Sequence, residues 1–93
     1  MEVVYAPRFR EDLLDVWRYI AQESPDQADR FKDEIKARTA TLVDFPYMYR
    51  QSIYFDTPDI RDLIIKGYVL PYRIDVQTGT ITVLGITKYR KEF

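Results

Sequence analysis

Residues 9–31 read FREDLLDVWRYIAQESPDQADRF, and their pattern predicts the two helices on which the rest of the fold is built. Its large apolar residues recur at helical spacing: Phe9, Leu13, Val16, Trp17 and Ile20. Side chains at this spacing share one face of a helix, because three or four residues make one turn. We therefore expect an amphipathic helix from about Arg8 to Gln22.

A second helix is predicted directly after the first. Ser24 is suited to cap it, Pro25 to occupy its first position, and Gln27 to complete the start signal. Its apolar stripe, which Arg38 interrupts, comprises Ala28, Phe31, Ile35, Leu42 and Phe45. We expect the helix to end near Asp44, before Phe45-Pro46. Two helices joined by so few residues pack as an antiparallel hairpin.

Short strands flank the predicted hairpin. Residues 2–6 are β-branched or aromatic and are stopped by Pro7, which indicates a first strand. In the second half we expect an antiparallel meander of strands at 60–66, 68–75 and 80–87, with turns at Gly67 and 77–79. Pro71 does not fit this pattern, because a proline has no amide hydrogen for a ladder. Either its strand is interrupted or its amide side faces no partner.

These elements predict one α+β domain over residues 1–93. Its order is β-αα-βββ, with the helical hairpin packed on one face of a small antiparallel twisted sheet. The pattern leaves open whether the first strand pairs beside the last.

Composition excludes much enzyme chemistry. The chain has no cysteine and no histidine, which rules out disulfides, thiolate nucleophiles, imidazole bases and zinc sites of the Cys/His type. Its formal net charge is −1, which disfavours a general nucleic-acid binder. Residues 1–46 carry seven basic and ten acidic side chains, whereas residues 47–93 carry seven and five. A phosphate-facing surface would therefore lie in the second half.

No apolar run reaches the length of a membrane span and the N-terminus has no signal-like segment, so we expect a cytoplasmic protein without membrane contact. The carboxylates of Asp56, Asp59 and Asp62 recur every three residues, but the glycine and terminal glutamate of a calcium loop are missing. We therefore expect no metal site and no cofactor.

Tyrosines in the segments without periodicity suggest a contact surface. Tyr47, Tyr49 and Tyr54 lie near Arg50, and aromatic residues beside basic ones stack nucleobases or anchor protein partners. Arg73 is expected on the sheet face away from the helices. A cross-strand ion pair between Arg73 and a neighbour such as Asp62 is the favoured role there.

The order of these motifs resembles the ParE/RelE superfamily of bacterial toxins. The resemblance rests on APRFREDL at residues 6–13, WRYIA at 17–21, Ser24-Pro25, ADRF at 28–31, Phe45-Pro46, RDL at 61–63, Gly67-Tyr68 and YRID at 72–75. It spans nearly the whole chain. It implies the same β-αα-βββ fold and a type II toxin–antitoxin pair. A cognate ParD- or RelB-like antitoxin would wrap its C-terminal segment around the toxin and assemble with it.

The superfamily divides by target. RelE-like members cleave ribosome-bound mRNA with basic residues and a late tyrosine or histidine, and the matching set here is Arg73, Lys88, Tyr89 and Arg90. The arginine that such toxins carry just after Gly-Tyr is Val69 in this chain. This loss favours the ParE-like branch, whose members poison DNA gyrase and whose role in plasmid stabilisation and growth inhibition requires no catalytic residue.

The resemblance and the residue types together supply candidate site residues. The expected target contacts are Arg50, Arg61, Arg73, Lys88, Tyr89, Arg90 and Lys91. The expected antitoxin contacts are Trp17, Ile20, Phe31 and Ile35, because a hairpin over one sheet face of so small a domain leaves apolar surface exposed. Three hypotheses stay open: a gyrase inhibitor, a ribosome-dependent mRNA endoribonuclease, and an inactive relic that only binds antitoxin.

Overall fold

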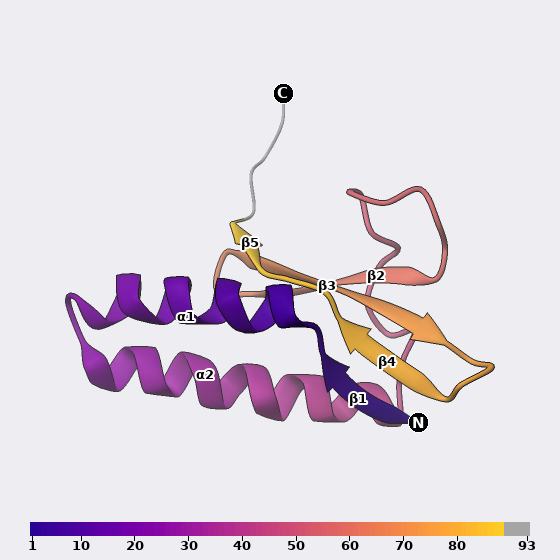
Figure 1. Ribbon diagram of the computed structural model, residues 1–93, viewed down its shortest axis with the longest axis horizontal. Coiled ribbons are helices and arrows are strands. Elements are labelled where there is room, and N and C mark those ends of the chain that lie inside the picture. The colour runs from indigo at the N-terminus through magenta and orange to yellow at the C-terminus, as the bar shows by residue number, and fades with distance from the viewer. Residues whose placement is uncertain (89–93) are drawn as a thin grey trace.

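The computed structural model describes residues 1–88, which form a helical hairpin on one face of a twisted sheet (Figure 1). The elements in chain order are β1 (Glu2–Tyr5), α1 (Pro7–Ala21), α2 (Pro25–Ala40), the 3-10 helix η1 (Thr41–Val43), β2 (Ile60–Ile65), β3 (Tyr68–Asp75), β4 (Thr80–Val83) and β5 (Thr87–Lys88). The predicted α+β fold is confirmed.

The helical hairpin begins where the sequence signals lie. Pro7 occupies the first turn of α1, and the Oγ of Ser24 accepts a hydrogen bond of 3.2 Å from the amide of Gln27 at the start of α2. The last turn of the predicted second helix tightens into η1, after which the chain leaves the helix. Phe45 was expected on the buried stripe, but it is exposed because it lies beyond that last turn.

The sheet is mixed, so the expectation of an antiparallel sheet is wrong at one strand. The order is β1-β4-β3-β2, in which β2, β3 and β4 form the predicted antiparallel meander. β1 pairs with β4 in parallel, with Val3 opposite Ile81. Apolar alternation determines which face a strand buries but not the direction of its neighbour, so the pattern could not predict this pairing.

The strand predicted at residues 80–87 is broken in two. The Leu84 amide donates to the Pro71 carbonyl at 2.8 Å, but Pro71 has no amide hydrogen to return to the ladder. The Ile86 amide donates instead to Oδ2 of Asp12 in α1 at 3.0 Å. The chain then rejoins β3 as β5, with Thr87 opposite Val69. The missing amide hydrogen of Pro71 in β3 is therefore accommodated by the gap between β4 and β5, the strands that pair with β3 there.

The core lies between the hairpin and the sheet. Its buried residues are Phe9, Phe31, Ile35, Leu42, Leu63, Ile65, Leu70, Tyr72, Ile74, Ile81, Val83 and Ile86. Phe9 is the buried residue of α1, whereas Leu13, Val16 and Ile20 are partly buried against the cluster. The predicted stripe of α1 therefore divides its apolar surface between the core and the outside.

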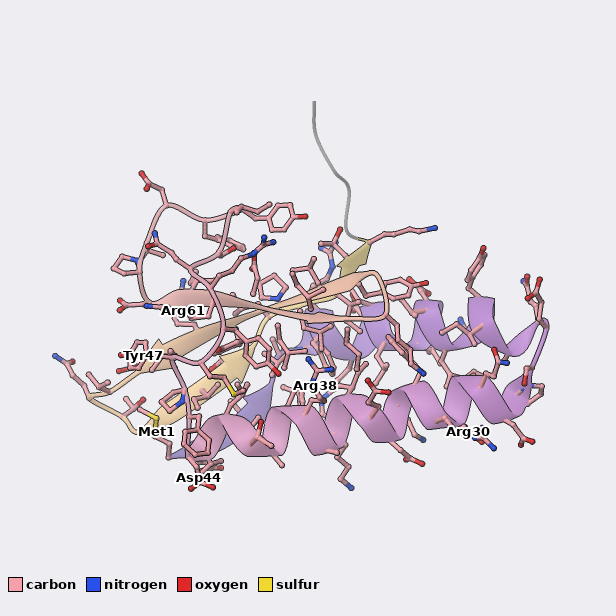
Figure 2. The ribbon with its side chains drawn as sticks, turned by 180° about the vertical axis from the view of Figure 1, so that it is seen from behind. Met1, Arg30, Arg38, Asp44, Tyr47 and Arg61 are labelled. Carbon is pink, nitrogen blue, oxygen red and sulfur yellow. The ribbon has the colours of Figure 1, made fainter. Side chains whose placement is uncertain are left out.

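A long loop joins η1 to β2. It rises beyond the sheet on the side opposite to α2 (Figures 1 and 2). Residues 50–52 run beside the outer edge of β2, where the Ser52 amide donates to the Ile60 carbonyl at 2.8 Å and the Asp62 amide donates to the Arg50 carbonyl at 3.0 Å. This pairing covers part of an edge strand that would otherwise be open. Within residues 1–88, no helix is long and apolar enough to cross a bilayer.

Candidate partner-binding surfaces

A hollow runs along the two helices and ends at β1. We call it the hairpin groove; the residues that line its two connected parts are Tyr5, Phe9, Arg10, Leu13, Leu14, Trp17, Lys32, Asp33, Ile35 and Lys36. The lining is mostly apolar. It includes Leu14, a large apolar side chain that is exposed to solvent. The indole nitrogen of Trp17 donates to Oδ1 of Asp29 at 2.9 Å, which holds the ring of α1 against α2. An open groove with an apolar lining can bind an apolar segment of a partner protein.

Basic side chains border this groove. Arg10 projects from α1, and Lys32 and Lys36 lie one turn apart on α2, with Asp33 as the acidic member of the lining. The groove therefore carries a positive rim although the chain as a whole has a formal net charge of −1. A partner with carboxylates beside its apolar residues would complement it.

The four predicted antitoxin contacts do not share one surface. Trp17 and Ile35 line the hairpin groove, whereas Ile20 and Phe31 line a second hollow with Tyr68. The Phe31 and Tyr68 rings pack with their centroids 5.3 Å apart. Phe31 and Ile35 are each 2% exposed, so they belong to the core and offer a partner only the floor of a hollow. The sequence pattern missed Leu13 and Leu14 as groove residues.

Two of the predicted target-contact arginines form contacts with other residues of the same chain. The Arg50 guanidinium lies 3.7 Å from Oδ2 of the buried Asp62. Arg61 donates to the carbonyls of Pro58 and Tyr49, both at 3.2 Å, and its guanidinium stacks over the ring of Tyr47 at 5.0 Å. Both arginines anchor the loop before β2.

The expected ion pair between Arg73 and Asp62 is wrong. Asp62 lies opposite Pro71, and Arg73 lies opposite Ile60, so the two side chains are displaced along the strands. The ion-pair partner of Asp62 is Arg50 instead. The ion-pair partner of Asp62 depends on the strand register, and a sequence pattern does not predict register to within one residue.

The residues proposed for a ribonuclease are not brought together where the structure describes them. Lys88 lies opposite Tyr68, which faces the helices, whereas Arg73 is an odd-numbered residue of the same strand and faces the other side. Five residues of strand separate the two positions, or about 16 Å along β3. Tyr89, Arg90 and Lys91 lie outside the described residues. Among residues 1–88, no group of acidic side chains is placed to hold a metal ion.

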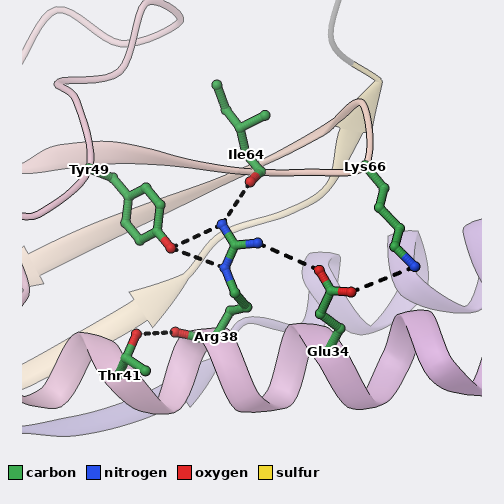
Figure 3. Close-up of polar contacts among 6 residues, drawn as sticks. All are labelled: Glu34, Arg38, Thr41, Tyr49, Ile64 and Lys66. Carbon is green, nitrogen blue, oxygen red and sulfur yellow. Dashed lines mark hydrogen bonds and ion pairs between the residues drawn. The ribbon is translucent and has the colours of Figure 1, made fainter.

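A polar network that sequence reasoning missed ties the loop to α2 (Figure 3). Arg38, which interrupts the apolar stripe of α2, donates to the Tyr49 hydroxyl at 3.1 Å and to the Ile64 carbonyl at 3.0 Å. Glu34 lies 3.5 Å from Arg38 and 3.6 Å from the ammonium of Lys66. The only sequence signal was a cation at a position where the helical period expects an apolar residue.

The structure separates the tyrosines into two groups. Tyr72 is buried, and its hydroxyl donates to the Pro46 carbonyl at 2.7 Å. Desolvation by burial is the main reason that the pKa of Tyr72 is raised well above 10.0, its ordinary value. Tyr47 and Tyr54 are exposed, as their non-periodic segments suggested, whereas Tyr49 is half-buried and its hydroxyl accepts from Arg38. The exposed group is therefore available to a partner, and the buried one is structural.

Solved structures share this arrangement of hairpin and sheet. A chain of the chromosomal ParDE system from P. aeruginosa superposes with a TM-score of 0.75 at 17% identity, covering 97% of both chains. An E. coli RelE mutant in complex with a RelBc antitoxin peptide gives 0.66 at 14% identity, covering 96% of this chain and 83% of that one. The intact E. coli RelBE complex gives 0.60 at 16% identity, covering 96% of both. These likenesses define the class of fold, that of the RelE/ParE toxins.

The family follows from the sequence match. Residues 3–93 match the family model described as the ParE toxin of the type II toxin–antitoxin system parDE. This match spans nearly the whole chain, so the protein belongs to the ParE toxin family. No curated protein matches the chain significantly.

Proposed function

We propose that this toxin arrests growth by inhibiting DNA gyrase in the cytoplasm and is neutralised by a cognate antitoxin. The observation that carries the proposal is the ParE family match over residues 3–93. The resemblance to the ParE-like branch implies a toxin that acts by binding its target enzyme. Such an activity requires a contact surface and no catalytic residue of its own.

Two features of the chain support a binding toxin as the proposed activity. A ribonuclease must bring cations to one phosphate in order to stabilise the developing charge. Arg73 and Lys88 project to opposite faces of the sheet, and Val69 stands where RelE-like toxins carry an arginine. The formal net charge of −1 also offers little attraction to ribosomal RNA.

The antitoxin is proposed to fill the hairpin groove. The groove offers the apolar side chains of Leu13, Leu14 and Trp17 between basic residues. An amphipathic helix with carboxylates along the edges of its apolar face fits this chemistry.

A gyrase supercoiling assay with the purified toxin tests the proposed target. We expect loss of supercoiling and accumulation of linear DNA, both reversed by excess antitoxin. Cleavage of transcripts in induced cells, with gyrase unaffected, would support the endoribonuclease instead. A toxin that binds antitoxin tightly but affects neither gyrase, transcripts nor growth would be an inactive relic.

A truncation tests the predicted role of the C-terminal segment. Removing residues 89–93 takes away Tyr89, Arg90 and Lys91, which are predicted target contacts, and keeps β5. We expect gyrase inhibition to be lost while antitoxin affinity stays unchanged, because the hairpin groove lies in residues 5–36. Full inhibition by the truncated toxin would contradict this role.

A further inference from the structure

The loop before β2 exposes three consecutive large apolar residues. We call Ile53, Tyr54 and Phe55 the loop tip; their exposed fractions are 61%, 44% and 41%. Single exposed apolar residues are common on protein surfaces, but a run of three is unfavourable unless it contacts something. The tip belongs to neither of the hollows beside the helical hairpin.

The backbone of the loop tip is held in place from below. The Ile53 amide donates to Oδ2 of Asp62 at 3.1 Å, and the Tyr54 amide donates to Oγ of Ser52 at 3.1 Å. Both acceptors belong to buried residues. The tip therefore presents its side chains from a fixed backbone, which lowers the entropy lost when a partner binds.

Holding the loop through Asp62 lowers the stability of the fold. Its side chain is buried, and Oδ1 has no hydrogen-bond partner within the described part of the chain. A buried carboxylate with an unsatisfied oxygen lowers stability compared with a packed apolar residue. Its place beneath an exposed apolar tip points to a need for that tip in one position.

A hollow adjoins the tip and offers a place for an anchoring side chain. Tyr54 and Phe55 line it together with Pro71, Leu84 and Ile86, where β4 breaks off. Buried anchors in such hollows, surrounded by apolar contacts, dominate the affinity of protein interfaces.

The charges beside the tip select its partner. Asp56 and Asp59 follow the tip and are exposed. Of the cations nearby, Arg8 lines the adjoining hollow but pairs with Asp12 at 3.0 Å, and Arg50 lies against the buried carboxylate of Asp62. Carboxylates at this place repel nucleic acid and favour a protein surface with lysine or arginine around an apolar patch. The hairpin groove has the opposite rim, in which Arg10, Lys32 and Lys36 favour an acidic segment.

We propose that the loop tip docks on an apolar, basic-rimmed patch of the toxin's target enzyme, and that this contact is separate from the antitoxin groove. A basic surface is what an enzyme that handles DNA offers. The inference rests on the proposed function for the identity of the enzyme but not for the existence of the contact.

The test compares Ile53→Ser/Phe55→Ser with the matched control Tyr19→Ser/Val76→Ser. Tyr19 and Val76 are 64% and 67% exposed and lie away from the tip, on α1 and in the turn after β3. We expect the tip variant to inhibit gyrase at least about tenfold more weakly than wild type and to lose growth arrest. The control should match wild type, and both variants should bind antitoxin with wild-type affinity and keep the wild-type melting temperature.

Three results would overturn the inference. The tip variant could arrest growth as wild type does, it could lose antitoxin affinity instead, or it could behave no differently from the control. A wild-type toxin that arrests growth without affecting gyrase would refute only the proposed target. The role of the tip would then still be tested by comparing growth arrest between the variants. A wild-type toxin that neither arrests growth nor inhibits gyrase would refute both the proposed target and the role of the tip.

A charge variant tests the predicted rim. Asp56→Asn/Asp59→Asn keeps the shape of the loop and removes the two carboxylates. We expect it to weaken gyrase inhibition a few-fold at low salt and to make inhibition less dependent on salt. Unchanged or stronger inhibition at low salt would contradict a basic rim on the partner.

Discussion

At the scale of single residues, the buried hydroxyl of Tyr72 links the sheet to the loop. It donates to the Pro46 carbonyl, and its ring packs edge-on against Tyr49 with centroids 6.4 Å apart. Burial raises the pKa of Tyr72 above its ordinary value of 10.0. Folding is therefore coupled to the neutral form of this side chain.

Tyr72→Phe should change how stability depends on pH. Below pH 10 the tyrosine is neutral in both states, and the substitution costs about 1 kcal/mol for the lost hydrogen bond. Above pH 10 only the unfolded chain ionises at this position, so wild type loses stability through Tyr72 as pH rises and Tyr72→Phe is spared that share of the loss. Urea unfolding at pH 7, 9 and 11 should show the difference narrowing, with exposed Tyr19→Phe as the control. A constant difference would contradict the assigned burial effect.

Gly85 is required for space. A Cβ there would lie 2.9 Å from Oδ2 of Asp12, the oxygen that accepts the Ile86 amide. We expect Gly85→Ala to lower the free energy of unfolding by about 1–3 kcal/mol. In an Asp12→Ala background the same substitution should cost much less, because the carboxylate is gone. Equal costs in the two backgrounds, measured by urea unfolding, would place the strain elsewhere.

At the scale of elements, helix and sheet are joined by side chains as well as by the core. Arg38 of α2 donates to the carbonyl of Ile64 on the outer edge of β2, where residues 50–52 also pair (Figure 3). These contacts cover an edge that could otherwise add a foreign strand. The edge of β2 is therefore a poor place for strand addition by a partner.

Arg38→Met tests how the loop is held to α2. The substitution keeps the apolar stem and removes the bonds to Tyr49 and Ile64. We expect a loss of about 1–2 kcal/mol in urea unfolding and faster proteolysis within residues 45–59. Arg30→Met on the exposed face of the same helix should change neither. Unchanged proteolysis in Arg38→Met would show that the pairing of residues 50–52 suffices.

At the scale of the whole molecule, the two proposed contact surfaces differ in charge. The hairpin groove has a basic rim, and the loop tip has acidic neighbours. A formal net charge of −1 conceals this separation. Opposite rims would let one small domain distinguish two partners.

Antitoxin binding should respond to the groove and not to the tip. We expect Leu14→Ser/Trp17→Ala to weaken antitoxin affinity by at least about tenfold, since both side chains line the groove. Lys32→Ser/Lys36→Ser should weaken it less and reduce its salt dependence. Calorimetric titration measures both, with Val76→Ser as the control. Wild-type affinity in the Leu14 and Trp17 variant would place the antitoxin elsewhere.

Particular residues show how far sequence reasoning reached. Ser24 and Pro25 predicted the start of α2 because capping is a local interaction within one turn. Phe31 and Ile35 were correctly placed on an apolar face, but periodicity cannot tell a core position from the floor of a groove. The partners of Arg50 and Arg61 are distant in sequence, so no local pattern could show that they anchor the loop.

The helical hairpin, the antiparallel meander and the family could all be predicted from sequence, because they depend on local patterns that keep their order along the chain. The folded structure was needed to reveal the parallel pairing of β1 with β4, the break between β4 and β5 and the ion pair of Arg50 with Asp62. It was also needed to show that Arg73 and Lys88 face opposite sides of the sheet, and that three apolar residues are exposed at the loop tip. Each of these depends on register and on contacts between distant segments, which are settled when the whole chain packs.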